Sequence, residues 1–149
     1  MRSVADNPII EAFFDEPTNT VSYLVADPGS GSAAVIDPVL DYEASTGTVD
    51  MRSAGRILAR ASERGWSIML VLETHAHADH LSAAPYFKAK TGARIGIGEH
   101  IRDVQKIFRP MFAADDVKSD GGDFDLLFRD GERLALGELE FEVMATPGH

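Results

Sequence analysis

The stretch Ile68–His80 reads Ile-Met-Leu-Val-Leu-Glu-Thr-His-Ala-His-Ala-Asp-His, and it decides how the rest of the sequence is interpreted. The apolar run at its start predicts a β-strand over Ile68–Glu73 that is buried on both faces. Three histidines and an aspartate follow directly. Because α/β proteins tend to bind ligands at the carboxyl ends of such strands, the sequence predicts a metal site where this strand ends.

The spacing of these four side chains suits metal binding. Residues two apart in an extended chain project to the same side, so His75 and His77 can reach one ion. Asp79 and His80 follow where the chain turns, and they can bind the same ion or a second one a few ångströms away. An incidental group of exposed loop histidines is the alternative. The combination of three histidines with a carboxylate makes it the less favoured one.

The composition restricts the chemistry further. The 149 residues include no cysteine, so a metal ion must be held by His, Asp or Glu, and no thiolate nucleophile is available. A formal net charge of −10 argues against nucleic acid as a partner. No apolar run approaches the roughly 20 residues of a membrane span, and Met1–Asn7 lacks the pattern of a signal peptide. We therefore expect a cytoplasmic protein with no membrane partner.

Regular elements flank the histidine run on both sides. The first three predicted strands form an antiparallel meander, whereas Pro38–Val49 and Met111–Asp125 are predicted to be loops. This order indicates one α/β layered domain over residues 1–149. The other predicted elements are strands at Ile9–Phe14, Thr20–Ala26, Ala33–Asp37, Ala93–Gly98 and Leu139–Ala145, and helices from an N-cap at Asp50 to about Arg64, over Pro85–Thr91 and over Glu99–Phe108.

Three further residues are considered as parts of the site. His149, which ends Thr146-Pro147-Gly148-His149, is a weak candidate alone, and together with the first cluster it becomes a credible third imidazole. Asp37 follows an apolar strand and can orient a ligand histidine through a hydrogen bond, although an aspartate at a strand end is more often a turn former. His100 lies in a helical pattern beside charged residues, and we expect it to be a surface residue.

The run His75–His80, preceded by Leu70–Thr74 and followed by Thr146-Pro147-Gly148-His149, resembles the metallo-β-lactamase fold superfamily. The resemblance covers the whole chain. Within the superfamily, Ile36–Tyr42, Glu73–His80 and Gly96–Ile101 are most similar to the bacterial persulfide dioxygenases. Those enzymes are similar to the ethylmalonic encephalopathy protein and to glyoxalase II. The implied fold is an αββα sandwich, of which this chain resembles the N-terminal half.

This resemblance implies a site and an activity. In the dioxygenases a single Fe(II) is held by the residues that match His75 and His149 and by an aspartate further along the family sequence, with positions left for a thiol persulfide and O2. The implied reaction oxidises glutathione persulfide, or a similar compound, to sulfite. In the hydrolase relatives two zinc or iron ions occupy the site, the first bound by His75, His77 and His149 and the second by Asp79 and His80. Asp79 is also the candidate catalytic residue, and we expect a homodimer.

Two other functions remain open at this point. One is a dinuclear thioester hydrolase of the glyoxalase II type, because the histidine run occurs in both groups. The other is an inactive fragment or pseudoenzyme, because family members continue well beyond the Thr-Pro-Gly-His segment. We expect the 149 residues alone to be poorly active, since the later half of the family brings the aspartate ligand and much of the substrate pocket.

Overall fold

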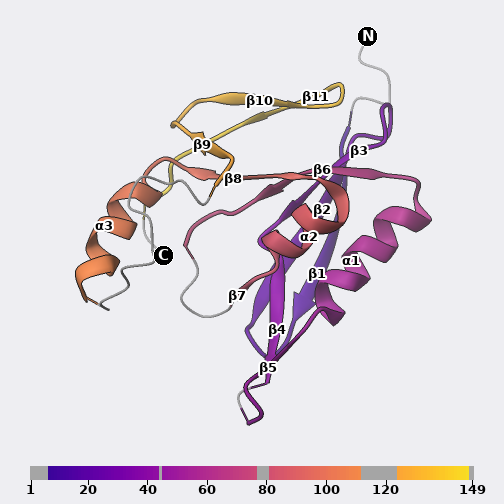
Figure 1. Cartoon of the computed structure of the whole chain (residues 1–149). Coiled ribbons are helices and arrows are strands. Elements are labelled where there is room, and N and C mark those ends of the chain that lie inside the picture. Colours follow the sequence, from indigo (N-terminus) through magenta and orange to yellow (C-terminus); the bar gives the residue numbers. More distant parts are fainter. Residues whose placement is uncertain (1–6, 44, 77–80, 112–123, 148–149) are drawn as a thin grey trace.

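The computed structural model describes residues 7–43, 45–76, 81–111 and 124–147. Its centre is a six-stranded sheet in the order β1-β2-β3-β6-β8-β9 (Figure 1). Two helices cover one face of this sheet, and a hairpin packs against the other, so the predicted α/β class is confirmed. The strands of the sheet are β1 Ile9–Asp15, β2 Thr20–Ala26, β3 Ser32–Ile36, β6 Ser67–Leu72, β8 Arg94–Gly98 and β9 Leu126–Phe128.

The pairing in this sheet changes direction at its middle. β1, β2 and β3 are antiparallel neighbours, as the predicted meander requires. β3, β6, β8 and β9 are parallel. The carboxyl ends of β3, β6 and β8 therefore meet at one edge of the sheet, which is where β6 delivers the histidine run.

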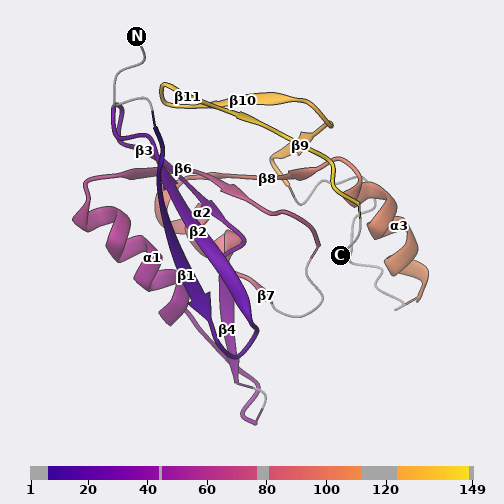
Figure 2. The same ribbon diagram turned by 180° about the vertical axis from the view of Figure 1, so that it is seen from behind.

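The helices α1 Arg52–Glu63 and α2 Ala84–Thr91 form the layer on one face. Helix α2 lies in front of β2 in Figure 1 and behind it in Figure 2. Apolar residues drive this packing, because burial of apolar surface is the main favourable term in folding. The buried cluster includes Leu24, Val35 and Val71 from the strands, Ile57 from α1 and Phe87 from α2.

The opposite face is covered in part by the hairpin of β10 Arg133–Leu136 and β11 Leu139–Glu142. Leu136 of β10 packs on Ala34 of β3 and Leu70 of β6. Val35 and Val71 face the helices, and each directly follows one of these two strand residues. Because adjacent residues in a strand point to opposite faces, Ala34 and Leu70 face the hairpin. The alternation predicted for the last strand holds as far as Val143, whereas the strand itself ends at Glu142 and Ala145 is exposed.

The prediction of a loop over Pro38–Val49 is wrong. This segment contains β4 Val39–Glu43 and β5 Thr48–Asp50, which pair with each other and, through β4, with β7 Leu81–Ser82. Polar residues and a glycine turn concealed these strands, because β5 and the outer end of β4 bury little surface, whereas Val39 at the start of β4 is buried (Figure 1). Tyr42 and Val49 are direct cross-strand partners and remain 58% and 52% exposed.

The predicted N-cap of the first helix is also wrong. Helix α1 has Met51 at its N-cap position, with no side-chain capping bond, and the Asp50 carboxylate instead accepts a hydrogen bond from the Met51 N–H at 2.7 Å. Asp41 of β4 supplies the acceptor for the first turn. Its carboxylate receives the Ser53 N–H at 2.8 Å and the Ser53 hydroxyl at 2.6 Å. The strand that sequence analysis missed therefore caps the helix.

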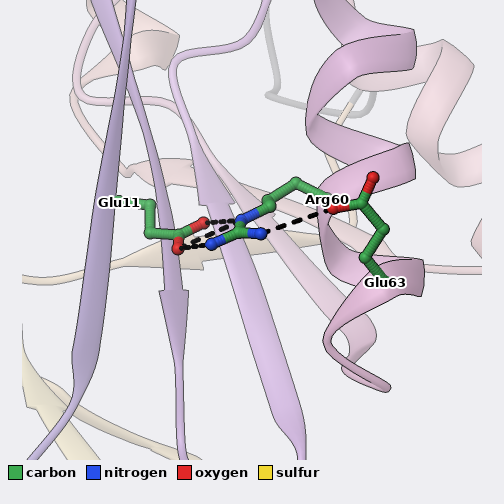
Figure 3. A network of polar contacts seen from close by, with 3 residues as sticks. All are labelled: Glu11, Arg60 and Glu63. Carbon is green, nitrogen blue, oxygen red and sulfur yellow. Dashed lines mark hydrogen bonds and ion pairs between the residues drawn. The ribbon is translucent and has the colours of Figure 1, made fainter.

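Two polar contacts fasten the outer elements to the sheet. Arg60 of α1 donates to both oxygens of Glu11 on β1 and to Glu63 (Figure 3). The Arg60 hydrogen bonds hold the pKa of Glu11 below its ordinary value. Buried Asp27, after β2, accepts the Ser30 hydroxyl at 2.6 Å and the Glu138 N–H at 2.8 Å, which joins the β2–β3 turn to the β10–β11 turn.

Helix α3, Ile101–Met111, follows β8 and completes the set of helices in the described part of the chain. Among the residues described, no helix combines the length and apolar character needed to cross a membrane.

Candidate metal centre

His75 lies just beyond the carboxyl end of β6, at the sheet edge where the parallel strands end together. The backbone there is tied to both neighbouring strands. The Asp37 N–H donates to the Leu72 carbonyl at 3.0 Å, and the Glu73 N–H donates to the Gly96 carbonyl at 2.9 Å. Residues Thr74 and His75 therefore leave the sheet from a point that is fixed on two sides.

Asp37 is the acceptor around which this segment is arranged. Its backbone has a φ of 51°, in the left-handed region that aspartate tolerates better than most residues. The buried Ser22 hydroxyl donates to the Asp37 carbonyl at 2.7 Å and stabilises this conformation. As a result, the Asp37 carboxylate accepts the Thr74 N–H at 2.8 Å and the Thr74 hydroxyl at 2.6 Å.

Thr74 connects this carboxylate to His75. The Thr74 Oγ1 atom lies 2.8 Å from His75 Nδ1. Since the threonine hydroxyl donates its only hydrogen to Asp37, its oxygen must act as the acceptor for His75, and Nδ1 must carry the hydrogen. The neutral imidazole then has its lone pair on Nε2, the atom through which a histidine of this tautomer binds a metal ion.

This arrangement fits a transition-metal ion. Metal-binding histidines usually donate their other ring N–H to a protein acceptor, which fixes the tautomer and the orientation of the ring. His75 is exposed at the surface, so an ion can approach it. A neutral imidazole nitrogen suits both iron and zinc, and the geometry of His75 alone favours neither.

The remaining predicted ligands, His77, Asp79, His80 and His149, lie outside the described residues. The part of the chain that the structure describes holds no group of three or more potential metal ligands. Asp37 is linked to His75 through Thr74, an intermediate that the sequence did not reveal, and its role in orienting a metal ligand stays a prediction. His100 is exposed, as predicted, and its Nδ1 atom lies 3.4 Å from Asp103 at the start of α3.

Glu73 and Ser82 lie beside this site and were not predicted as functional residues. Glu73 is only 8% exposed, although a glutamate at the end of a strand would be expected to reach solvent. The Ser82 hydroxyl donates to its Oε1 atom. An acidic residue that directly follows an apolar run is the one signal in the sequence that points to such a buried pair.

Comparison with known proteins identifies a family and several relatives of this chain. Residues 15–149 match the metallo-beta-lactamase superfamily. The chain is 48% identical over 141 residues to a probable metallo-hydrolase of Burkholderia pseudomallei, covering 94% of this chain and 48% of the relative. It is 36% identical over 142 residues to glyoxylase B2 of Dictyostelium discoideum, covering 94% of this chain and 49% of the relative.

A solved structure gives the same result for the fold. ETHE1 from Myxococcus xanthus superposes with a TM-score of 0.66 at 26% identity, covering 94% of this chain and 49% of that chain. The chain spans about half the length of the curated relatives it matches. The family match over residues 15–149 confirms the resemblance found in the sequence. The chain belongs to the metallo-β-lactamase superfamily.

Proposed function

We propose that the protein is a non-haem iron persulfide dioxygenase that oxidises glutathione persulfide, or a similar thiol persulfide, to sulfite with O2. Members of the superfamily are generally metal-dependent enzymes that use zinc or iron. The observation that carries the metal-dependent part of the proposal is the Asp37–Thr74–His75 hydrogen-bond chain, which suits His75 to bind a metal ion. The likeness to ETHE1 over 94% of the chain supports the choice of the dioxygenase group.

The residues of this chain have separable roles in the proposal. His75 binds the metal through Nε2, together with His149, and Thr74 keeps the His75 ring in one orientation. Asp37 holds Thr74 by two hydrogen bonds, so neither side chain needs to reorganise when the ion binds. When bound, Fe(II) with two histidines and one carboxylate supplies the positions at which the persulfide sulfur and O2 are brought together.

A dinuclear thioester hydrolase is the second candidate function. The identity of 48% to a probable metallo-hydrolase and of 36% to a glyoxylase favours it. In this function His75, His77 and His149 would hold one ion and Asp79 and His80 a second, and the two ions would supply an activated water as the nucleophile. The two candidates differ in whether O2 is consumed.

The test compares two substrates on the protein at its natural length, purified without oxygen and loaded with Fe(II). One assay follows O2 uptake and sulfite formation from glutathione persulfide, and the other follows thioester cleavage of S-lactoylglutathione. We expect stoichiometric O2 uptake and sulfite, with little thioester cleavage. Thioester cleavage without O2 uptake would overturn the proposal in favour of the hydrolase.

A further inference from the structure

We propose that Glu73 and Ser82 are positioning residues that close the two ends of the segment carrying the histidine run. They precede and follow the eight residues 74–81, and their side chains are joined by a hydrogen bond. This inference rests on the metal centre of the proposed function and assigns it a second set of supporting residues beside Asp37 and Thr74. We refer to the hydrogen-bonded set Ala84, Ser82 and Glu73 as the clasp.

The direction of each hydrogen bond in the clasp follows from its donors. The Ala84 N–H donates to the Ser82 Oγ atom at 3.0 Å. A serine hydroxyl that accepts in this way still has its own hydrogen, and that hydrogen is donated to Oε1 of Glu73. Ser82 therefore acts as acceptor and donor at once, and a residue without a hydroxyl group removes both bonds.

Glu73 is buried, so its carboxylate depends on hydrogen bonds from the protein. A carboxylate that is only 8% exposed needs hydrogen-bond donors to compensate for the water it loses. The Ser82 hydroxyl is one such donor, and it comes from β7, the next element along the chain after β6. Burial thus gives the bond a larger structural effect than an exposed pair would have.

The clasp completes a circuit that also includes Asp37. The Asp37 side chain holds Thr74, at the start of the segment. Two residues later, Val39 pairs with Ser82 at the segment's end, and the Ala83 N–H donates to the Pro38 carbonyl at 3.0 Å. Figure 1 shows β7 beside β4 and leading into α2. Residues 37–39 therefore anchor both ends of the segment, and the clasp joins those ends directly.

This circuit predicts how His75 responds to changes at a distance. Loss of the Ser82 hydroxyl removes one hydrogen bond from the Glu73 carboxylate, on the residue that directly precedes Thr74, and releases the first N–H of α2. The position from which Thr74 approaches Asp37 then becomes less defined, and the His75 ring loses its fixed orientation. Metal affinity should fall although neither Glu73 nor Ser82 binds the ion.

The test uses two variants of the full chain that are matched in size. Ser82→Val removes the hydroxyl, and Ser82→Thr restores it on a side chain of the same shape, which suits a β-strand equally well. Co2+ serves as the probe, because its visible absorption reports both affinity and ligand geometry. We expect Ser82→Val to weaken Co2+ binding about 10- to 100-fold and to alter the spectrum. Ser82→Thr should stay close to wild type.

Hydrogen exchange of the Ala84 amide gives a readout that needs no metal. Ala84 is the first residue of α2, so its N–H has no partner within the helix and depends on Ser82 for protection. We expect protection in wild type and in Ser82→Thr, and its loss in Ser82→Val. An unprotected Ala84 amide in the wild-type chain would overturn the clasp even if Ser82→Val did not fold.

The remaining outcomes separate the clasp from the function it rests on. Equal Co2+ affinity and equal spectra in the Val and Thr variants would overturn the clasp and leave the metal centre intact. No Co2+ binding by the wild-type chain, with a protected Ala84 amide, would overturn the metal centre on this chain and with it the positioning role. Weakened binding in Ser82→Val alone, with an altered spectrum, supports both.

Discussion

The Asp37 carboxylate accepts two hydrogen bonds from Thr74, one from its backbone N–H at 2.8 Å and one from its hydroxyl at 2.6 Å. The second bond determines which nitrogen of His75 carries the hydrogen, because the threonine oxygen is left as an acceptor 2.8 Å from Nδ1. A carboxylate at the end of β3 thereby controls a side chain that follows β6.

Thr74→Val tests this relationship, because valine has the shape of threonine without the hydroxyl. We expect metal affinity to fall roughly 10- to 100-fold, since the His75 tautomer is no longer fixed. The free energy of unfolding should fall by about 1–3 kcal/mol, because the hydroxyl makes two hydrogen bonds and one of them is to a carboxylate. Isothermal titration with Zn2+ and urea unfolding measure the two quantities. Thr74→Ser is the control and should retain the affinity.

A pair of glycines in β8 tests the packing of the sheet. A Cβ atom added at Gly96 would lie 2.5 Å and 2.9 Å from two atoms of the buried Phe128 ring, whereas one added at Gly98 would meet nothing within 4 Å. We expect Gly96→Ala to lower the free energy of unfolding by about 1–3 kcal/mol, as overpacking does. Urea unfolding of the two alanine variants provides the comparison. Equal stability of both would show that β9 does not pack as described.

Asp27 tests the pH dependence of stability. Hydrogen bonds from the Ser30 hydroxyl and the Glu138 N–H hold the pKa of Asp27 below the ordinary aspartate value. Its stabilising effect is therefore fully present above the unfolded value of about 3.9 and is lost as the pH falls through the lower folded value. Asp27→Asn should be less stable than wild type at neutral pH, and the difference should shrink in acid.

Urea unfolding of both chains between pH 7 and about pH 3 measures that difference. Ser30→Ala, which removes one donor to the same carboxylate, should show a smaller effect in the same direction. A constant difference across this range would contradict the role assigned to the ionised Asp27 side chain.

The Glu11–Arg60 contact tests how α1 is held against the edge strand (Figure 3). The two side chains are 22% and 40% exposed, so water and salt weaken their attraction. A double-mutant cycle with Glu11→Gln and Arg60→Met should give a favourable coupling that declines in 1 M NaCl, where the screening length is only about 3 Å. A coupling that is insensitive to salt would mean that packing of the Arg60 stem, and not charge, joins the two elements.

The sequence predicted the elements that bury apolar surface. The run Ile68–Glu73 appears as the central strand β6, and the meander before it is present as predicted. Periodicity reveals such elements because one face must be apolar. β5 and the outer end of β4 have no such face, since Tyr42 and Val49 remain exposed and only the start of β4 is buried. Pairing between backbones, which leaves little trace in the sequence, creates them.

The hydrogen bonds that hold the site segment were harder to predict, because they join residues that are far apart along the chain. A side chain that binds a nearby residue along the chain can be recognised from spacing, as the histidines were. Asp37 reaches Thr74 across 37 positions, and Asp41 reaches Ser53 across 12. Such contacts depend on how the strands are ordered in the sheet, which spacing alone does not determine. Asp37 was recognised as a candidate only through its place at a strand end.

The most direct test of the account is native mass spectrometry of the protein at its natural length, purified without oxygen, as wild type and as His75→Ala. The excess of the native mass over the denatured mass identifies and counts the metal. We predict one iron ion per chain in the wild-type protein and none in His75→Ala, because the proposed metal centre uses His75, oriented by Asp37 and Thr74, as a ligand. Iron retained stoichiometrically in His75→Ala, or two zinc ions per wild-type chain, would contradict the account.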